Sequence, residues 1–524
     1  MFYCDEPSFC LAPGLPSLLS IMSNTLTLPK ALYRGAQVRT ADQRAMQQPD
    51  SEGSVLMERA GEAAWQLLRS RWPRARRILV LCGPGNNGGD GYVLARRAQE
   101  AGCHPRVLTL EHEQVAQGDA LSAQRRLLQA GVVPRGFGPD LLQNVDVVVD
   151  ALFGIGLTRE VSDPARAAIV ALNRCGAPIL ALDLPSGLDA DTGRVWGVAV
   201  RAAATLTFIG LKAGLFTGAG REHSGVIYFD DLATPAAVFD GITPQARRIT
   251  RDDLQGLMPR RARHAHKGDA GHVLLVGGAP GMGGAVQLAG IAAYRAGAGL
   301  VRLATHREHA ASLAAGQPEL MAQAVDTTQD LRRLLASPSV LAVGPGLGQD
   351  AWARSLWGTA LESPYLQVVD ADALTLLAQD PVRRDDWILT PHPGEAACLL
   401  GCGVADIQHD RFAAVREIAV RFGGVCVLKG SGTLIAHDGE AGLWLCDRGN
   451  PGMASGGSGD VLTGVIAALR AQGLSPIAAA RLGVWVHASA GDVAVAEAGE
   501  IGMLASDLLP FIRAGINALL GPCV

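Results

Sequence analysis

The sequence predicts an α/β fold arranged in two domains, because short apolar strands alternate with helices along most of its 524 residues. Several strands are continuous apolar runs, such as residues 77–82 and 178–183, which are typical of parallel strands covered by helices on both faces. The 64 glycines exceed the number in an average chain of this length, which fits many tight turns between strands and helices. A chain this long also exceeds the usual size of a single hydrophobic core.

The first half predicts a parallel sheet whose strands are each followed by a helix or a turn. We expect helices over residues 41–69, 90–101, 118–130 and 163–174, and strands over residues 77–82, 106–110, 145–150, 178–183, 205–208 and 226–229. Residues 1–21 are mildly apolar and contain prolines, and we expect either a disordered extension there or a segment that precedes the true start codon.

A polar, basic stretch over residues 241–268 interrupts the alternation, and we place a domain boundary in it, so that the domains span 22–245 and 246–524. The second half then predicts another α/β series. Its expected strands cover residues 272–276, 300–304, 340–343, 366–369, 387–389, 425–428, 433–436 and 442–445, and its expected helices cover residues 284–296, 395–400, 410–422, 459–471 and 476–497. The two series differ, which indicates two different catalytic domains fused together.

Charge and composition exclude several classes of partner. The net charge of −4 gives no electrostatic basis for binding nucleic acid or an anionic membrane. No apolar run reaches the roughly 18–20 residues that a membrane span needs. The ten cysteines are scattered without a regular spacing, as expected for free thiols in a reducing cytoplasm. We therefore expect a cytoplasmic protein with no nucleic-acid or membrane partner.

Polar residues of the first half gather where three strands end. The segment GPGNNGGDG, residues 83–91, follows a strand and opens a helix, and its glycines let backbone N–H groups approach a ligand closely. Asp150 ends a second strand, and Asp183 and Ser186 follow a third. Each of these singly could be an ordinary helix cap. Parallel strands present their carboxyl ends at one edge, so Asn87, Asp150 and Ser186 together predict hard oxygen ligands for an alkali or alkaline-earth cation. Asp183 is a candidate acid or base.

The second half contains a Gly/Ser turn, residues 456–459, immediately before an amphipathic helix. The free N–H groups of such a helix start form an anion hole for phosphate or for a developing negative charge. Asp460 is placed to take a proton from a hydroxyl group as phosphate is presented to it. The alternative is an ordinary N-capping Asp, and the doubled glycine argues against it.

Other turns of this half also follow strands and contain glycine. Residues 429–433 place a Lys beside a Gly-Ser-Gly turn, which suits a diphosphate. His392 lies between two prolines, Gly346 lies in the turn GPGLG, and Ala285 ends the glycine-rich segment 277–285.

Lysine is scarce, since Lys30, Lys212, Lys267 and Lys429 are the only four and the other basic residues are arginines. A lysine retained in such a chain indicates a position that needs a compact positive charge. The alternative is that these four lysines occur where they do by chance. Three of the four lie beside glycines in the motifs, and Lys429 is the one that we expect on a nucleotide phosphate.

The motifs GPGNNGGDG, VDALFGIGL, DLPSG and TFIGLKAGL, spread over about residues 30–235, resemble the NAD(P)H-hydrate epimerase family. The resemblance implies a Rossmann-like three-layer α/β/α sandwich, potassium bound by Asn87, Asp150 and Ser186, and catalysis or substrate binding at Asp183. It also implies that the hydrated nicotinamide nucleotide is held by Asn86, Asn87, Gly88, Gly89, Asp90, Gly154, Ile155, Gly156, Leu157, Thr158, Arg159, Glu160 and Asp183.

The motifs KGDAGHVLLVGG, AGAGLVRLAT, GPGLG, TPHPGE, LKGSGT and NPGMASGGSGD, over about residues 250–520, resemble the ADP-dependent NAD(P)H-hydrate dehydratase family, which has a ribokinase-like fold. The resemblance implies catalysis by Asp460 and hydrated nicotinamide near Ala285, Gly346, His392 and Asp460. It implies nucleotide phosphates on Lys429, Gly430, Ser431, Gly432, Thr433 and Gly459.

Both halves in one chain resemble the bifunctional NAD(P)H-hydrate repair enzymes of bacteria. The resemblance implies that the first domain interconverts the R and S forms of hydrated NADH or NADPH. The second domain would then dehydrate the S form at the expense of ADP, giving AMP and phosphate. We expect potassium in the first domain, ADP as a co-substrate and a homo-oligomer, and the need for Mg²⁺ is open. Two alternatives are a ribokinase-like, ATP-dependent kinase of a vitamin-like alcohol and a regulatory module that binds nicotinamide nucleotides.

Overall fold

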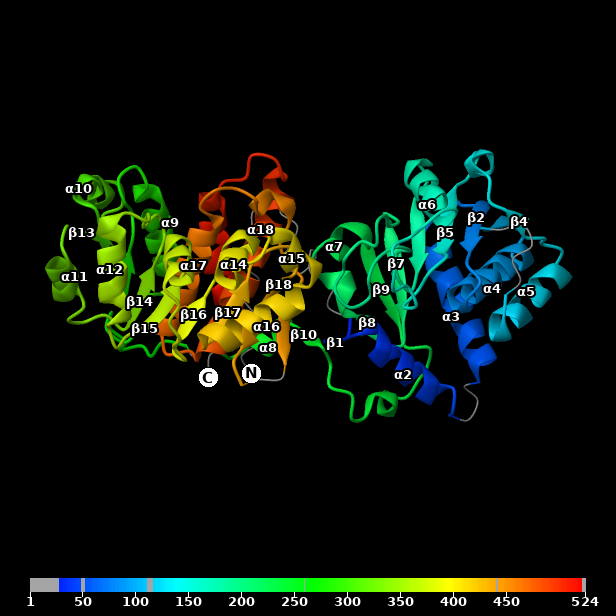
Figure 1. Cartoon of the computed structure of the whole chain (residues 1–524), viewed down its shortest axis with the longest axis horizontal. Coiled ribbons are helices and arrows are strands. Elements are labelled where there is room, and N and C mark those ends of the chain that lie inside the picture. Colours follow the sequence, from blue (N-terminus) through cyan, green and yellow to red (C-terminus); the bar gives the residue numbers. More distant parts are fainter. Residues whose placement is uncertain (1–27, 49–51, 111–115, 259, 440–441, 521–524) are drawn as a thin grey trace, which may run out of the picture.

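The computed structural model of the chain describes residues 28–48, 52–110, 116–258, 260–439 and 442–520. The extension that we expect over residues 1–21 lies outside the described residues. The fold is mixed α/β in two domains, with the N-terminal half on the right of Figure 1 and the C-terminal half on the left. None of the helices in the described ranges combines the length and the apolar character needed to cross a bilayer.

The N-terminal half contains a seven-stranded sheet in the order β4-β3-β2-β5-β6-β7-β9, and its neighbouring strands are all parallel. Its strands are β2 (Arg77–Cys82), β3 (His104–Thr109), β4 (Arg135–Gly136), β5 (Val147–Ala151), β6 (Ile179–Leu182), β7 (Ala204–Phe208) and β9 (Val226–Asp230).

Helices cover both faces of this sheet, because successive side chains of a strand point to opposite faces. Val147 and Val149 pack with α3 (Gly53–Arg71), α4 (Asn86–Glu100) and α5 (Gly118–Gln129), whereas Val148 packs with α6 (Ala165–Arg174). The first half is therefore a three-layer α/β/α sandwich.

The single helix predicted over residues 41–69 is wrong, because the structure has two helices, α2 (Gly35–Ala45) and α3. The sequence has a proline at position 49, and proline disfavours helix in the residue before it. Helix α4 also begins at Asn86 rather than near residue 90, which places the Asn-Asn-Gly-Gly-Asp run inside the first turns of the helix.

The C-terminal half builds most of a twelve-stranded sheet in the order β13-β12-β11-β14-β15-β16-β17-β18-β19-β10-β1-β8. Strands from this half are β11 (His272–Val276), β12 (Leu300–Thr305), β13 (Met321–Ala324), β14 (Val340–Val343), β15 (Leu366–Val369), β16 (Trp387–Leu389), β17 (Val425–Leu428), β18 (Thr433–His437) and β19 (Leu443–Cys446). Pairing is parallel from β13 to β17, and β18 is antiparallel to both of its neighbours.

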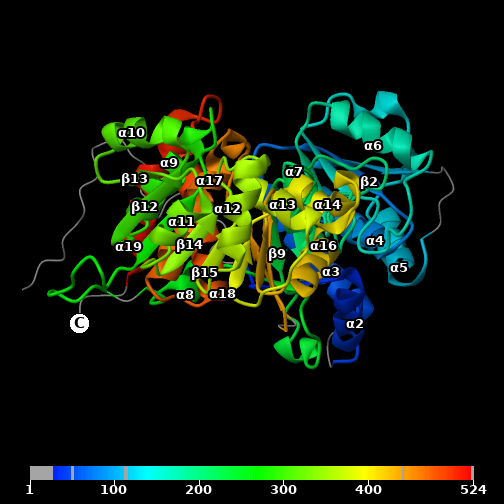
Figure 2. The same ribbon diagram turned by 60° about the vertical axis from the view of Figure 1, so that its left-hand side comes forward.

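Each face of this sheet has its own layer of helices. Leu275 and Ala342 pack on the face covered by α9, α17, α18 and α19, and Leu274 and Leu341 pack on the face of α12, α13, α14 and α16 (Figure 2). The first group comprises α9 (Gly283–Arg295), α17 (Ser458–Ala471), α18 (Pro476–Ala498) and α19 (Leu508–Leu519), and the second comprises α12 (Ala351–Leu361), α13 (Asp372–Gln379), α14 (Pro393–Leu400) and α16 (Arg411–Phe422).

Three short strands extend this sheet across the boundary between the halves. The strand β10 (Ala246–Arg248) pairs with β19 on one side and with β1 (Ala31–Tyr33) on the other, and β1 pairs with β8 (Leu211–Lys212). The last two strands of the sheet thus come from the N-terminal half. One continuous sheet therefore runs from the C-terminal half into the N-terminal half (Figure 1).

Candidate active sites

The first candidate site is a cavity of about 750 Å³ at the carboxyl ends of β2, β5, β6 and β7. Of the residues predicted for this site, Asn86, Asn87, Asp90, Asp183 and residues 154–160 line the cavity. Gly88 and Gly89 do not line it. A Cβ atom on Gly88 would lie 2.0 Å from the carbonyl oxygen of Gly83, and one on Gly89 would lie 2.5 Å from Met57, so both glycines allow α4 to pack closely.

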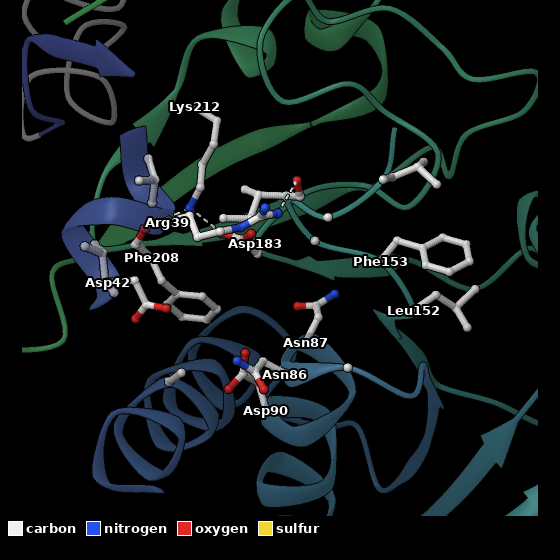
Figure 3. A pocket seen from close by; sticks show the side chains of 18 of the residues that line it. Arg39, Asp42, Asn86, Asn87, Asp90, Leu152, Phe153, Asp183, Phe208 and Lys212 are labelled. Atoms are coloured by element: carbon white, nitrogen blue, oxygen red, sulfur yellow. Dashed lines mark hydrogen bonds and ion pairs between the residues drawn. The ribbon is translucent and has the colours of Figure 1, made fainter. Parts of the chain in front are cut away.

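An ion pair between Lys212 and Asp183 lies on one wall of this cavity (Figure 3). The ammonium of Lys212 also donates hydrogen bonds to Thr207 Oγ1 at 3.0 Å and to the carbonyl oxygen of Phe208 at 2.8 Å. Only 1% of the Lys212 side chain is exposed. Asp183 has a φ of 64°, a left-handed conformation that is uncommon for a residue other than glycine, and such strained residues gather at functional sites. A proton donor and a proton acceptor therefore lie side by side.

Two more carboxyl groups line the cavity, Asp90 on α4 and Asp42 on α2 (Figure 3). Burial raises the pKa of Asp90 well above its ordinary value, and the charges of Asp183 and Asp42 raise it further. Burial also raises the pKa of Asp42, and Lys212 opposes that shift. Both effects favour the protonated form of Asp90, and a protonated carboxyl group can donate a hydrogen bond to a ligand.

Asp150 and Ser186 are in direct contact with each other, and neither of them lines the cavity. The hydroxyl of Ser186 donates to Asp150 Oδ1 at 2.6 Å, and its backbone N–H donates to Asp150 Oδ2 at 2.8 Å. Burial raises the pKa of Asp150 to about 6, and these hydrogen bonds oppose the shift. Asn87 and Asp183 both lie close to Gly154. A Cβ atom on Gly154 would be 2.9 Å from Asp183 Oδ2 and 3.7 Å from Asn87 Cβ. Both polar atoms of the Asn87 side chain are buried without a hydrogen-bond partner among the described residues.

The second candidate site lies at the start of α17. Gly457 has a φ of 94°, a conformation that favours glycine, and it precedes Ser458 and Gly459 in the first turn of the helix. Burial raises the pKa of the Asp460 carboxyl to about 7, with a further contribution from Asp370 and opposition from Lys429. Such a value suits a general base that works near neutral pH.

Lys429 lies in a cluster of carboxylates beside this helix start. Its Nζ atom lies 2.7 Å from Asp370 Oδ1 and 3.7 Å from Glu395 Oε2. Thr463 on α17 donates to Asp370 Oδ2 at 2.6 Å, which holds the Asp370 carboxylate in place. A Cβ atom on Gly459 would lie 3.3 Å from Lys429 Nζ, so the lysine lies directly against the first turn of α17.

The structure brings the other predicted residues to the same end of the sheet in pairs. A Cβ atom on Gly346 would lie 3.1 Å from the Cβ of Ala285, so these two residues are neighbours. His392 caps α14, where its Nδ1 atom accepts hydrogen bonds from the N–H groups of Gly394 and Glu395. Its Nε2 atom lies 3.3 Å from Glu395 Oε1, which connects His392 to the cluster around Lys429.

Several residues in these sites are missing from the sequence prediction. Asp370 and Glu395 meet Lys429, and Asp42 lines the first cavity. Asp370 directly follows an apolar run in the sequence, as Asp150 and Asp183 do, and that position was a signal that could have identified it. Asp42 lies on a helix with no glycine-rich turn, and nothing in its sequence surroundings distinguishes it.

Comparison with known proteins finds two matching parts. A family model described as "YjeF-related protein N-terminus" matches residues 53–214, and one described as "NAD(P)H-hydrate dehydratase" matches residues 273–513. A solved structure, the ADP/ATP-dependent NAD(P)H-hydrate dehydratase from Bacillus subtilis co-crystallized with ATP and Mg²⁺, is 28% identical and covers 52% of this chain and 97% of its own, with a TM-score of 0.46.

Full-length relatives match both halves together. The bifunctional NAD(P)H-hydrate repair enzyme Nnr of Coxiella burnetii is 45% identical over 486 residues, which cover 93% of this chain and 99% of that protein. The enzyme of the same name from Escherichia coli is 41% identical over 498 residues, which cover 95% of this chain and 96% of that protein. The chain therefore belongs to the family of bifunctional NAD(P)H-hydrate repair enzymes.

Proposed function

We propose that this chain repairs hydrated NADH and NADPH, with epimerisation in the first cavity and ADP-dependent dehydration at the start of α17. The observation that carries the proposal is that each half has its own acid–base centre. The Asp183–Lys212 ion pair lies in a cavity of about 750 Å³, and Asp460 lies in the first turn of α17, whose free N–H groups suit an anion. A single-function protein would not need both.

In the first site, Asp183 and Lys212 are the proposed proton-transfer pair. Inverting the carbon that bears the hydroxyl group requires a donor that protonates the departing oxygen and an acceptor that takes a proton from the returning water. The contact between the ammonium and the carboxylate provides both functions at one wall of the cavity. Asn86, Asp90 and the loop over residues 154–160 would then bind the rest of the nucleotide.

The residues proposed for potassium fit a hard monovalent cation. Asp150 contributes a buried carboxylate, Ser186 a hydroxyl, and Asn87 a side-chain oxygen that has no hydrogen-bond partner among the described residues. Such oxygens are the ligands that alkali cations prefer. A bound potassium ion would supply a fixed positive charge that stabilises the ionised form of Asp150 and attracts a phosphate group of the substrate.

In the second site, Asp460 is the proposed general base. It would take the proton from the hydroxyl of the S form as the terminal phosphate of ADP is transferred to that oxygen, leaving AMP. The C–O bond of the phosphate ester then breaks with inorganic phosphate as the leaving group, and the adjacent ring carbon loses a proton to phosphate or water, which forms the double bond that restores the dihydropyridine ring. The N–H groups at the start of α17 would stabilise the negative charge on the phosphate during both steps.

Among the described residues of this half, no group of three or more His, Cys, Asp or Glu side chains is placed to hold a metal ion. Asp370 and Glu395, the carboxylates next to Asp460, are already paired with Lys429. We therefore assign no catalytic step to Mg²⁺.

One assay distinguishes this proposal from its alternatives. The protein is mixed with hydrated NADH and ADP, and the return of NADH absorbance is followed. We expect complete recovery from a mixture of R and S forms. Phosphorylation of a vitamin-like alcohol by ATP without any recovery of NADH would identify a ribokinase-like kinase instead. Binding without either reaction would identify a regulatory module. We also propose a cytoplasmic location and a homo-oligomeric state, and size-exclusion chromatography of the purified chain tests the second.

A further inference from the structure

Arg411, the first residue of α16, lies behind the loop over residues 429–433 and is almost completely buried, with 1% of its surface exposed. Its Nη2 atom donates to the carbonyl oxygens of Leu428 at 3.3 Å, Lys429 at 3.1 Å and Gly432 at 3.5 Å. Gly430 has a φ of 132°, and a Cβ atom there would lie 3.1 Å from Arg411 Nη1. The loop is therefore folded tightly over the guanidinium group.

The charge of Arg411 has no carboxylate partner within the described part of the chain. Its remaining hydrogen bonds go to the side-chain oxygen of Gln408 at 3.2 Å and to the hydroxyl of Thr217 at 3.1 Å, which are both neutral. Burial accordingly lowers the pKa of Arg411 to about 10, which leaves the group charged at neutral pH. An unneutralised cation beneath a glycine-rich loop favours an anionic ligand on that loop.

Thr217 belongs to the N-terminal half and is fully buried against the same loop. Its Oγ1 atom lies 3.3 Å from the carbonyl oxygen of Ser431 and 3.2 Å from that of Gly432, and the N–H of Gly218 donates to the Ser431 carbonyl at 3.0 Å. Gly432 has a φ of 68°, and a Cβ atom there would lie 2.0 Å from the carbonyl oxygen of Phe216. The two backbones are thus in direct contact, and no side chain fits between them.

We propose that Arg411 and Thr217 are positioning residues for the nucleotide of the dehydratase reaction. They hold the loop over residues 429–433 in one shape from two sides, and the charge of Arg411 attracts the diphosphate of ADP through that loop. The proposal rests on the proposed function, which places the nucleotide phosphates on this loop. It goes further by making the nucleotide affinity of the C-terminal half depend on a residue of the N-terminal half.

The test uses the full chain and measures the Kd of ADP by titration calorimetry, together with the KM for ADP and kcat. Thr217→Val removes the hydroxyl and keeps the shape of the side chain. We expect the Kd and the KM for ADP to rise about tenfold, because the hydrogen bond between this hydroxyl and the guanidinium of Arg411 is lost. The kcat should change less than about twofold. Thr217→Ser keeps the hydroxyl and should restore the wild-type Kd. Arg411→Lys keeps the charge and loses the planar fork, and we expect a similar rise in the Kd.

Matched controls separate positioning from general damage. Thr205 is another buried threonine of the N-terminal half, and its hydroxyl donates to the carbonyl oxygen of Ser224 at 2.7 Å, so Thr205→Val is the control for Thr217→Val. Arg416 lies on the same helix as Arg411 and donates at 3.1 Å to the carbonyl oxygen of Gln245, the residue before β10, so Arg416→Lys is the control for Arg411→Lys. Both controls should leave the Kd of ADP within about twofold of the wild type.

The outcomes distinguish this inference from the proposed function. An unchanged Kd in a folded Thr217→Val variant overturns the inference, and so does an equal rise in the Thr205→Val control. If the wild type binds ADP but does not restore NADH, the proposed reaction fails and the Kd comparison still decides the role of Thr217. If the wild type does not bind ADP, both the proposed dehydration reaction and the positioning role of Thr217 and Arg411 are refuted.

Discussion

The pH dependence of dehydration follows from the environment of Asp460. Its pKa is raised to about 7, first by burial and then by the charge of Asp370, and Asp460 must be ionised to act as a base. About one-tenth of the carboxyl groups would be ionised at pH 6 and about nine-tenths at pH 8. The rate of dehydration of the S form at saturating ADP should therefore fall about tenfold from pH 8 to pH 6, and it should level off above pH 8.

Asp460→Asn removes the base and keeps the size of the side chain. We expect the rate of dehydration to fall about 10²- to 10⁴-fold, which is the usual contribution of a general base. The assay follows the return of NADH absorbance from the purified S form with ADP, and chromatography of the two epimers measures epimerisation separately. Asp330→Asn replaces a first-turn carboxylate of another helix, α11 (Thr328–Leu334), and should leave both rates unchanged. A pH profile that is flat between pH 6 and pH 8, or an Asp460→Asn variant within tenfold of the wild type, would refute this reasoning.

The same substitution should stabilise the fold above neutral pH. Because the folded-state pKa of Asp460 is raised, its contribution to stability is complete at a pH below the unfolded-state value and is lost as the pH rises toward about 7. We expect the Tm of Asp460→Asn to exceed that of the wild type at pH 8 and to approach it at pH 4. Scanning calorimetry at both values measures the difference, and a lower Tm at pH 8 would contradict the burial of an ionised carboxylate here.

Three further predictions concern the other charged groups. Lys212→Met should reduce epimerisation at least 100-fold, because it removes the partner of Asp183, while dehydration of the pure S form serves as the internal control and should persist. Exchanging K⁺ for choline should slow epimerisation and leave dehydration unchanged. Asn87→Ala should remove that dependence of epimerisation on the ion. Equal epimerisation rates of the wild type in both salts would exclude the cation site. Lys429→Arg should raise the KM for ADP about tenfold, because the ammonium lies 2.7 Å from Asp370 and directly against Gly459, which leaves little room for a broader guanidinium. An unchanged KM would show that the positive charge alone is enough.

Apolar strands and the residues that follow them could be predicted from the sequence, because both signals are local. The run over residues 77–82 is apolar enough to indicate a buried strand, and the structure has β2 at these residues. Asp150 and Asp183 follow such runs, and parallel pairing brings the ends of β5 and β6 to one edge of the sheet. The contact of Ser186 with Asp150 follows from the same neighbouring strands.

Contacts between distant segments could not be predicted in this way. The strands β1, β8 and β10 have two or three residues each, which is too short for any periodic pattern, and they form only because partners from both halves supply their hydrogen bonds. Lys429 was expected on a phosphate, but its pairing with Asp370 joins residues that lie 59 positions apart in the sequence. The scarcity of lysine nevertheless pointed first to Lys429 and more weakly to Lys212 and Lys267. Lys212 and Lys429 both lie in carboxylate-rich sites, whereas Lys267 is exposed in a turn.

The continuous sheet makes the geometry of the first site depend on the second half. Lys212 lies in β8, whose partner β1 is held by β10, and β10 in turn pairs with β19 of the C-terminal half. The predicted boundary between residues 245 and 246 falls immediately before β10, so a cut there would separate β1 from the strand that anchors it. Residues 213–218 leave β8 and reach the loop over residues 429–433 through Thr217. One stretch of chain therefore carries the lysine of the first site at one end and touches the proposed nucleotide loop of the second at the other, which gives a physical reason for the two activities to occur in one polypeptide.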